Sequence, residues 1–330
     1  MAGALNRPRA ARGRDAAPLR GRRQDLHGLV AAELDAPAPA HATAFGAELA
    51  RRFPTAAAVL FYGSVLRTGD RDGIMDFYVL TREPQPGVRG LANRLLWPGV
   101  SYHERGAGRR TDRAKVATMT LGQFEKAVLG RGADTTIWTR FVQPSALVWS
   151  ADDQVTEAVR QAVAEAAVTA ARFAAVLGPA EGSAAAYWTA LFQETYAAEF
   201  RVEARGREAQ ILAVDPQRYA AMLPAAWREA GLSWEVLEGE RLRPLVERGV
   251  RARLRRAWRL RRLLGKPLNL ARLAKAAFTF EGAAKYAAWK IERHTGITVP
   301  LTPWRERHVI LASPGVFWRL WRARRRKSLG

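Results

Sequence analysis

The sequence predicts a mixed α/β (α+β) domain in the first half of the chain, followed by a mainly helical second domain. In the first half, short apolar runs are bounded by glycine, proline and aspartate, which is typical of β-strands. From Ala151 onward, long alanine-rich segments place apolar residues at helical spacing. We therefore predict a disordered basic arm at 1–23, the α/β domain at 24–150, the helical domain at 151–312 and an amphipathic C-terminal helix at 313–330.

The composition limits the partners and the compartment. The 330 residues include 53 Lys and Arg against 31 Asp and Glu, a formal net charge of +22. Such an excess attracts nucleic acid, an anionic membrane surface or phosphorylated substrates. The absence of cysteine excludes disulfides and thiolate metal sites and fits a reducing compartment. Charges such as Glu165 and Arg172 interrupt the apolar stretches, so we expect no membrane-spanning segment.

The elements of the first domain follow from local patterns. Residues 1–23 are rich in Arg, Ala, Pro and Gly without an apolar period, so we expect a basic arm, with an organellar transit segment as the alternative. We predict helices at 25–34, 42–53, 90–97 and 121–130, the last capped by Thr120, and strands at 56–62, 74–80, 100–104 and 113–121. The segment 134–149 then ends the domain, with Arg140 just before the Gln143-Pro144 turn.

The second domain is predicted to be helical throughout. The expected helices lie at 155–177, 184–204, 216–231, 233–250, 249–267 and 269–294. The last two are strongly basic. Around Trp258, apolar residues at helical spacing can face a core and leave the arginines in solvent, and a binding role for this helix is the alternative.

The most informative stretch runs from 56 to 81. Gly63 and Ser64 come where the first predicted strand ends, so that bare backbone amides and a hydroxyl can approach a phosphate. Asp76 lies inside the second, apolar strand, and a carboxylate there needs a partner because burying an unpaired charge is costly. A divalent metal with a triphosphate would explain both features. This is the layout of the nucleotidyltransferase superfamily, with an ordinary hairpin carrying one solvent-facing acid as the alternative.

The second metal ligand is not assigned by the pattern. The superfamily has two acids two residues apart, whereas Ile74 and Tyr78 occupy the positions beside Asp76 here. Asp70 and Asp72, in the loop before the strand, are the nearest candidates, and we take Asp72 with Asp76 as the predicted ligands of Mg²⁺.

Three other residues have weaker signals. Lys115 and Arg140 are single basic residues beside predicted strands, and ordinary surface charges would look the same. His103 has no partner at metal-ligand spacing, so we expect a structural or surface histidine.

The C-terminal segment has the composition of a helix that lies in a membrane interface. Aromatic residues can enter the headgroup boundary while arginines hold anionic lipid. A solvated tail and an RNA-binding tail are the alternatives. The predicted membrane residues are Phe317, Trp318, Arg319, Trp321, Arg322 and Arg325.

Six segments have counterparts, in the same order, in one known family: YGSVL at 62–66, MDF at 75–77, KVATMT at 115–120, TRFVQP at 139–144, YAAEFR at 196–201 and KAAFTFEGAAKYAAWK at 275–290. On these segments the chain resembles the mitochondrial-type phosphatidate cytidylyltransferases, the translocator assembly and maintenance family, which has bacterial members. It departs from the family motifs at Val65 (glycine), Gln143 (lysine) and Glu199 (aspartate).

The resemblance implies a nucleotidyltransferase domain followed by a helical, winged-helix-like domain. It implies the Mg²⁺-dependent reaction of CTP with phosphatidic acid to give CDP-diacylglycerol and pyrophosphate, a step of phospholipid biosynthesis. It also implies roles for matched residues: catalysis by Asp76 and Lys115, nucleotide binding by Gly63, Ser64, Lys115 and Arg140, and further site positions at Tyr196, Glu199 and Arg201.

The expected location is peripheral, on the cytoplasmic face of a bacterial inner membrane, with the matrix side of the mitochondrial inner membrane as the alternative. Two other functions stay open at this point. One is an RNA-binding or RNA-modifying nucleotidyltransferase, with nucleic acid as the partner of the basic helices. The other is a non-catalytic adaptor, suggested by the missing second acid.

Overall fold

The computed structural model describes residues 25–70, 73–106, 111–199, 207–295 and 298–307. The predicted basic arm and the predicted C-terminal helix lie outside these ranges. So do eight of the residues singled out from the sequence: Asp72, Arg201, Phe317, Trp318, Arg319, Trp321, Arg322 and Arg325. Among the described helices, none combines the length and the apolar character needed to cross a bilayer.

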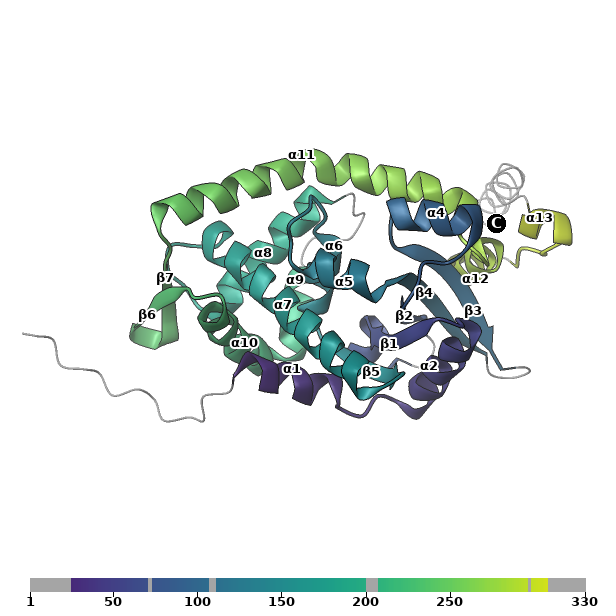
Figure 1. Cartoon of the computed structure of the whole chain (residues 1–330), viewed down its shortest axis with the longest axis horizontal. Coiled ribbons are helices and arrows are strands. Elements are labelled where there is room, and N and C mark those ends of the chain that lie inside the picture. The colour runs from purple at the N-terminus through teal and green to yellow at the C-terminus, as the bar shows by residue number, and fades with distance from the viewer. Residues whose placement is uncertain (1–24, 71–72, 107–110, 200–206, 296–297, 308–330) are drawn as a thin grey trace, which may run out of the picture.

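A five-stranded mixed sheet confirms the predicted α/β class (Figure 1). Its strands are β1 (Ala56–Tyr62), β2 (Met75–Thr81), β3 (Gly99–Arg105), β4 (Asp112–Thr120) and β5 (Ser145–Ser150). The spatial order is β3-β4-β2-β1-β5. The pair β2 and β4 is parallel and the other neighbours are antiparallel. This order places β2, which carries Asp76, between β1 and β4.

Both faces of the sheet are covered. One face packs on α2 (Ala40–Arg52), and the other on α1 (Leu26–Leu34), α5 (Leu121–Val128) and α6 (Thr136–Phe141). Every residue of β1 is buried, which explains why the strand reads as a continuous apolar run instead of an alternating one. Thr120 caps α5 as predicted: its hydroxyl accepts from the backbone nitrogen of Gln123 at 3.1 Å, and the Gln123 side chain accepts from the backbone nitrogen of Thr120.

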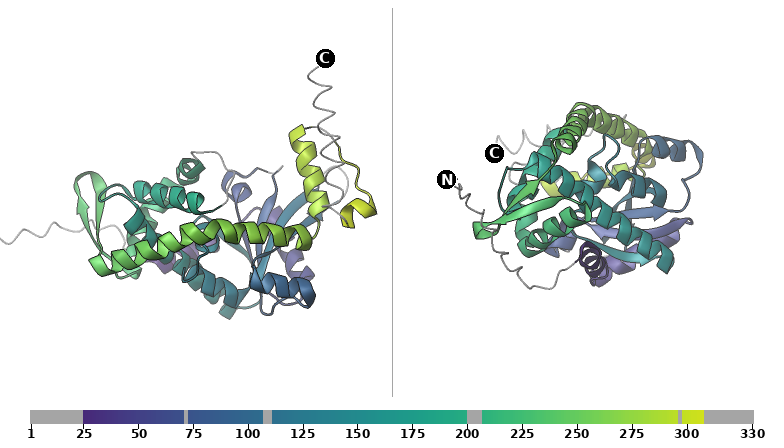
Figure 2. Two further views of the ribbon diagram at one scale, coloured as in Figure 1. Left: turned by 90° about the horizontal axis from the view of Figure 1, so that it is seen from above. Right: turned by 60° about the vertical axis from the view of Figure 1, so that its left-hand side comes forward.

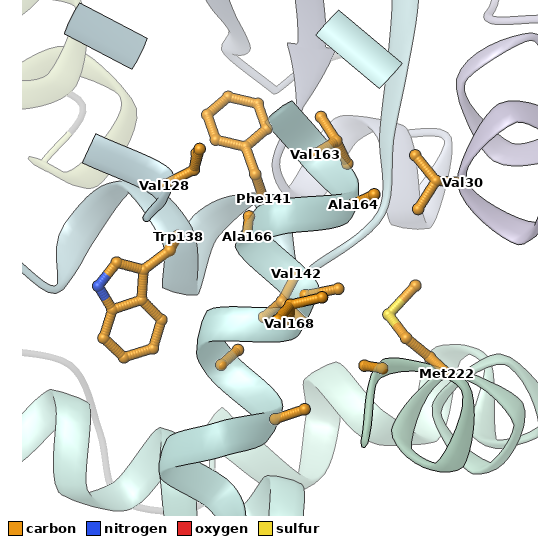
Figure 3. Close-up of a cluster of buried hydrophobic side chains, with 14 of the residues drawn as sticks. Val30, Val128, Trp138, Phe141, Val142, Val163, Ala164, Ala166, Val168 and Met222 are labelled. Atoms are coloured by element: carbon orange, nitrogen blue, oxygen red, sulfur yellow. The ribbon is translucent and has the colours of Figure 1, made fainter. Parts of the chain in front are cut away.

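The long helix α7 (Asp153–Leu177) lies at the centre of the molecule and contacts α1, α5 and α6 on the sheet side. On its other side it contacts α8 (Ala184–Ala198) and α10 (Pro216–Glu229), with α9 (Arg207–Val214) packed on α8. Figure 3 shows side chains of α1, α6 and α10 meeting those of α7, among them Val30, Trp138, Val163 and Met222. One apolar cluster therefore includes residues from both sides of Ala151.

The prediction of a helix at 233–250 was wrong for all but the last three residues, which begin the next helix. The segment 233–247 is not α-helical. It forms a hairpin of β6 (Ser233–Leu237) and β7 (Arg241–Leu245), joined by the short 3₁₀ turn η1 (Glu238–Glu240) in which Gly239 has φ +68°. Apolar and charged residues alternate here with a period of two, and Pro244 would interrupt a helix. The hairpin is tied to the core because the Tyr187 hydroxyl donates to the Leu242 carbonyl at 2.8 Å. The winged-helix arrangement of this region stays a prediction.

The basic helices near the end of the described chain also differ from the prediction. One helix, α11 (Arg248–Thr279), continues through Pro267 and runs along the length of the molecule (Figure 1). It ends before Gly282, whose φ is +77°, and α12 (Ala283–Thr295) then leads away from it (Figure 2). The short α13 (Pro303–Arg307) follows.

The remaining helices, α3 (Ser64–Thr68) and α4 (Gly87–Leu95), lie in the sheet domain. The helix α3 was not predicted, and α4 begins three residues earlier than expected.

Candidate functional site

Three neighbouring strands, β1, β2 and β4, each place a polar residue at the same level of the sheet. Asp76 of β2 is directly opposite Tyr62 of β1 and directly opposite Lys115 of β4. Residues paired in this way project from the same face, because side chains alternate along every strand. The face is that of Leu60 and Tyr78, which the helical half of the molecule covers. The register thus places Asp76 and Lys115 next to each other on this face of the sheet.

The turn after β1 leaves open the space beside the carboxylate. Gly63 has φ +93° and ψ −163°, a conformation that residues with a Cβ rarely adopt. A Cβ placed on it would lie only 2.5 Å from the Oδ2 atom of Asp76. The chain then turns at once into α3, which begins at Ser64. The Gly-Ser pair is therefore next to the strand acid in space as well as in the motif.

These residues line one polar cavity of about 190 Å³. Its wall comes from the sheet, from α3 and α6, and from α8 and α9 of the helical half. Six of the residues singled out from the sequence meet here: Gly63, Ser64, Asp76, Lys115, Arg140 and Tyr196. The remaining lining residues are Tyr62, Arg67, Gln143 and Ile211. With three cationic side chains and one carboxylate, the lining suits a ligand that carries several negative charges.

Arg140 is held rigidly in this wall. Its Nη1 atom donates to the Tyr78 hydroxyl at 3.1 Å, and its guanidinium lies 5.3 Å from the ring centroid of Tyr62. Burial opposes the charge, but the electrostatic effect of Tyr62, Tyr78 and Asp76 outweighs it and raises the pKa of Arg140 above its ordinary value. The side chain is therefore a permanent, pre-oriented cation.

Arg67 is a lining residue that the sequence reasoning missed. It lies in α3, and its Nη1 atom donates to Oε1 of Gln143 at 3.4 Å. Gln143 in turn donates to the Thr139 carbonyl at 3.2 Å. An arginine three residues after a Gly-Ser turn has no distinctive spacing, so only the tertiary contact with Gln143 identifies it.

A second cavity, of about 310 Å³, lies beyond Arg140, which lines both cavities. Its other lining residues come mainly from α11 and from the β3 side of the sheet: Tyr78, Pro98, Val100, Thr136, Glu199, Asn269, Leu270, Arg272, Leu273, Lys275 and Ala276. This second cavity combines three basic side chains, those of Arg140, Arg272 and Lys275, with leucines, unlike the polar cavity around Asp76.

The basic residues of the second cavity are fixed by specific contacts. Arg272 forms an ion pair with the buried Asp134 at 2.5 Å and stacks over the ring of Trp97. The Lys275 Nζ atom donates to Oδ1 of Asn93 and to the carbonyls of Leu96 and Pro98, at 2.6–3.0 Å. Burial, and secondarily the charge of Arg272, lowers the pKa of Lys275 to about 8. These contacts hold the end of α11 against the sheet domain.

Three residues from the sequence analysis lie outside the polar cavity. Glu199 is buried, accepts from the Thr135 hydroxyl at 2.5 Å and lines the second cavity instead. Asp70 is exposed, with its Oδ2 atom 3.8 Å from Nη2 of Arg293. Nowhere in the described ranges do three or more His, Asp or Glu side chains gather as a metal-binding group. His103 contacts Arg52 and Ser101, as expected of a structural histidine.

Comparisons with known proteins do not assign a family. No protein-family model matches the sequence, and no curated protein matches it. A search of solved structures finds, among others, a nucleotidyltransferase-like protein from Exiguobacterium sibiricum 255-15. The alignment has 12% identity and a TM-score of 0.26, and it covers 83% of this chain and 88% of the other. A similarity at this level identifies neither a family nor an activity for this chain.

Proposed function

We propose that this chain is a nucleotidyltransferase that transfers the cytidylyl group of CTP to phosphatidic acid. The observation that supports it is the meeting of Gly63, Ser64, Asp76, Lys115 and Arg140 in one polar cavity, although they come from four separate segments of the chain. The identity of the nucleotide and of the acceptor rests on the family resemblance of those segments.

The polar cavity provides the groups that a triphosphate requires. Lys115, Arg140 and Arg67 offer three cations, and arginine in particular can bind two phosphate oxygens at once. Ser64 adds a hydroxyl. The contact between Arg67 and Gln143 also accounts for one departure from the family: where the family has a lysine, this chain has a glutamine that positions an arginine from α3.

The residues present fit Mg²⁺ bound together with a nucleotide. Mg²⁺ is commonly held by one or two carboxylates plus substrate phosphates and water, so Asp76 with a triphosphate is a sufficient donor set. Gly63 keeps the space beside Oδ2 of Asp76 clear of a side chain. Asp76 would hold the ion, with Asp72 as the predicted second ligand. When bound, Mg²⁺ neutralises the charge of the triphosphate and of the departing pyrophosphate.

In the proposed reaction, a phosphate oxygen of phosphatidic acid forms a bond to the α-phosphorus of CTP while the bond from that phosphorus to the bridging oxygen breaks. Pyrophosphate leaves with the electron pair, and no covalent enzyme intermediate is required. Arg140 lines both cavities and can hold the acceptor phosphate against the nucleotide. The second cavity, with Arg272 and Lys275 among leucines, suits a phosphate that carries apolar chains.

The test is to incubate the purified full chain with α-labelled CTP, Mg²⁺ and phosphatidic acid, and to extract the lipid. A labelled lipid that depends on CTP, on Mg²⁺ and on Asp76 supports the proposal. Parallel reactions with labelled ATP, GTP and UTP measure nucleotide choice. An extract without label under all four nucleotides would contradict it.

A nucleotidyltransferase acting on RNA is the second candidate, favoured by one observation. Six arginines of α11 line an open groove of about 550 Å³: Arg248, Arg251, Arg255, Arg256, Arg259 and Arg262. A groove of this kind can follow a phosphate backbone. The same labelled nucleotides offered with RNA, without lipid, would place label on the RNA if this candidate were correct.

A further inference from the structure

The short helix α4 exposes an apolar side. Val88, Leu91 and Leu95 are spaced by three and four residues, so they lie on one side of the helix, and 57–85% of each residue is exposed. Gly90 is buried, and a Cβ there would overlap the carbonyl oxygen of Gln85. The helix is thus packed through its glycine while its large apolar residues face outward. Single exposed leucines are ordinary, but three on one short helix form a patch.

The helix α11 also exposes large apolar residues. Its inner side is marked by the buried Trp258 and Gly265, whereas Leu263, Leu270 and Leu273 are 61–71% exposed. The contacts of Lys275 with Asn93 and Leu96 hold α4 beside this part of α11. Figures 1 and 2 both show the two helices next to each other. We name the six residues Val88, Leu91, Leu95, Leu263, Leu270 and Leu273 the α4–α11 surface.

The charges on the two helices themselves have one sign, while Glu194 lines the arginine groove and Glu199 lines the second cavity. Along its 32 residues, α11 contains eleven Arg and Lys and no Asp or Glu, and α4 contains two Arg and no acid. The arginines of the groove lie between Arg248 and Arg262, and the three leucines of the surface follow between Leu263 and Leu273. Exposed apolar residues on two helices that contain cations and no acid match an anionic bilayer, where side chains enter the headgroup boundary and cations meet lipid phosphates. An RNA backbone would contact the arginines but would leave the leucines in water.

We propose that the α4–α11 surface docks on an anionic lipid bilayer. Leu270 and Leu273 belong to this surface and also line the second cavity, so the cavity that contains Arg272 and Lys275 opens where the bilayer would lie. A lipid with a phosphate headgroup can then reach Arg140 while its chains remain among the leucines. This delivery of the acceptor rests on the proposed function, whereas the docking does not.

The test uses the full chain and vesicles of phosphatidylcholine with phosphatidylglycerol, so that binding does not depend on recognition of a substrate. A triple variant, Val88→Ser with Leu91→Ser and Leu95→Ser, removes apolar area that is already exposed. We expect the vesicle-bound fraction at high salt to fall about tenfold or more, since that part of the binding is apolar. The matched control is Val236→Ser with Leu245→Ser, which exchanges exposed apolar residues of the β6-β7 hairpin and leaves binding unchanged.

A second variant separates the charge contribution. Arg255→Gln with Arg259→Gln, in the arginine groove, is expected to weaken vesicle binding at low salt and to have little effect at high salt, because salt screens exposed charges. Vesicles of phosphatidylcholine alone should bind the wild type weakly.

Three results would overturn the docking proposal. The first is a triple variant that sediments with the vesicles like the wild type. The second is vesicle binding that is lost when residues 308–330 are removed but is unchanged in the α4 triple variant and in Arg255→Gln with Arg259→Gln. The third is a wild-type dimer or RNA complex that the triple variant loses while vesicle binding is unchanged. Transfer to a soluble short-chain phosphatidate, measured in parallel, reports on the proposed function alone, and we expect the triple variant to retain it.

Discussion

Gly63 lies directly against the side chain of Asp76. The backbone of Gly63 has φ +93°, and a Cβ on Gly63 would lie 2.5 Å from the Oδ2 atom of Asp76. The two features recognised in the sequence, a Gly-Ser turn and an acid on the next strand, are thus parts of one contact. Any side chain at position 63 would both strain the turn and fill the space next to the carboxylate.

The exchange Gly63→Ala is expected to lower both stability and nucleotidyl transfer. Strain at a positive φ costs about 1–3 kcal/mol, and the added methyl would displace Asp76. The matched control is Gly69→Ala, because Gly69 also has a positive φ, +68°, but no atom lies within 4 Å of its added Cβ. Urea unfolding should show a smaller loss for Gly69→Ala, which has the left-handed strain without the clash, and transfer should fall at least about tenfold more for Gly63→Ala. Equal activities in the two variants would contradict the role of the Gly63 contact.

The exchange Asp76→Asn is expected to abolish Mg²⁺-dependent transfer while the protein stays folded. If Asp76 holds Mg²⁺ as proposed, removal of the carboxylate would leave the ion without that ligand in the polar cavity. A loss of several kcal/mol of charge stabilisation would then lower kcat/KM by about a hundredfold or more. Asp70→Asn serves as the comparison, because Asp70 is exposed beside Arg293 and does not line the polar cavity. Circular dichroism and the labelled-lipid assay measure the two properties. A near-normal Asp76→Asn enzyme would exclude Asp76 as the ligand.

The exchange Arg140→Lys keeps the positive charge but loses the planar group that lies over Tyr62 and donates to Tyr78. Losing one charge-assisted phosphate contact costs about 1.5–3 kcal/mol, so we expect kcat/KM to fall roughly ten- to a hundredfold. Lys115→Ala should lower kcat/KM by a similar factor, chiefly by raising the KM for CTP. If kcat and KM for CTP are unchanged in both variants, neither residue binds the nucleotide and both have only a structural role.

The parts of the fold that could be predicted from the sequence are those with a local cause. The strands β1 and β2 are short apolar runs between turn residues, and the α5 cap follows from Thr120 and Gln123. The β6-β7 hairpin was missed because its charged residues, such as Glu235 and Arg243, pair with each other in the exposed strands and give the segment a helical composition. Its period-two alternation and Pro244 were the available signals.

The composition of the candidate site could be predicted only in part. Asp76 and Lys115 lie on the same level of the sheet because β2 and β4 are neighbours, and neither spacing nor composition fixes strand order. The contact between Arg67 and Gln143 joins α3 to the end of α6 and has no local signature. Tyr196 and Glu199 come from one matched segment, yet they line different cavities.

The hydrogen bonds of His103 with Arg52 and Ser101 determine which ring nitrogen carries the proton. The Nη1 atom of Arg52 lies 3.1 Å from Nδ1, and since arginine has no acceptor, Nδ1 must accept this hydrogen bond. The Nε2 atom, 2.8 Å from the Ser101 hydroxyl, therefore carries the proton of the neutral ring. Protonation of Nδ1 would place two donors against each other. Burial and then the charge of Arg52 lower the pKa of His103 below its ordinary value of 6.5.

This lowered pKa predicts a loss of stability in mild acid. Between 6.5 and the lower pKa of the folded protein, the unfolded chain binds a proton that the folded chain excludes, so the free energy of unfolding falls as the pH drops through this window. His103→Gln removes the titrating group, and the stability of the wild type relative to this variant should decline from about pH 7.5 to pH 5 in urea unfolding. Arg52→Gln should keep the histidine but raise its pKa, measured by NMR titration of the imidazole, and so reduce the same decline. A stability difference between wild type and His103→Gln that is constant across this range would show that His103 binds its proton equally well in the folded and unfolded chains.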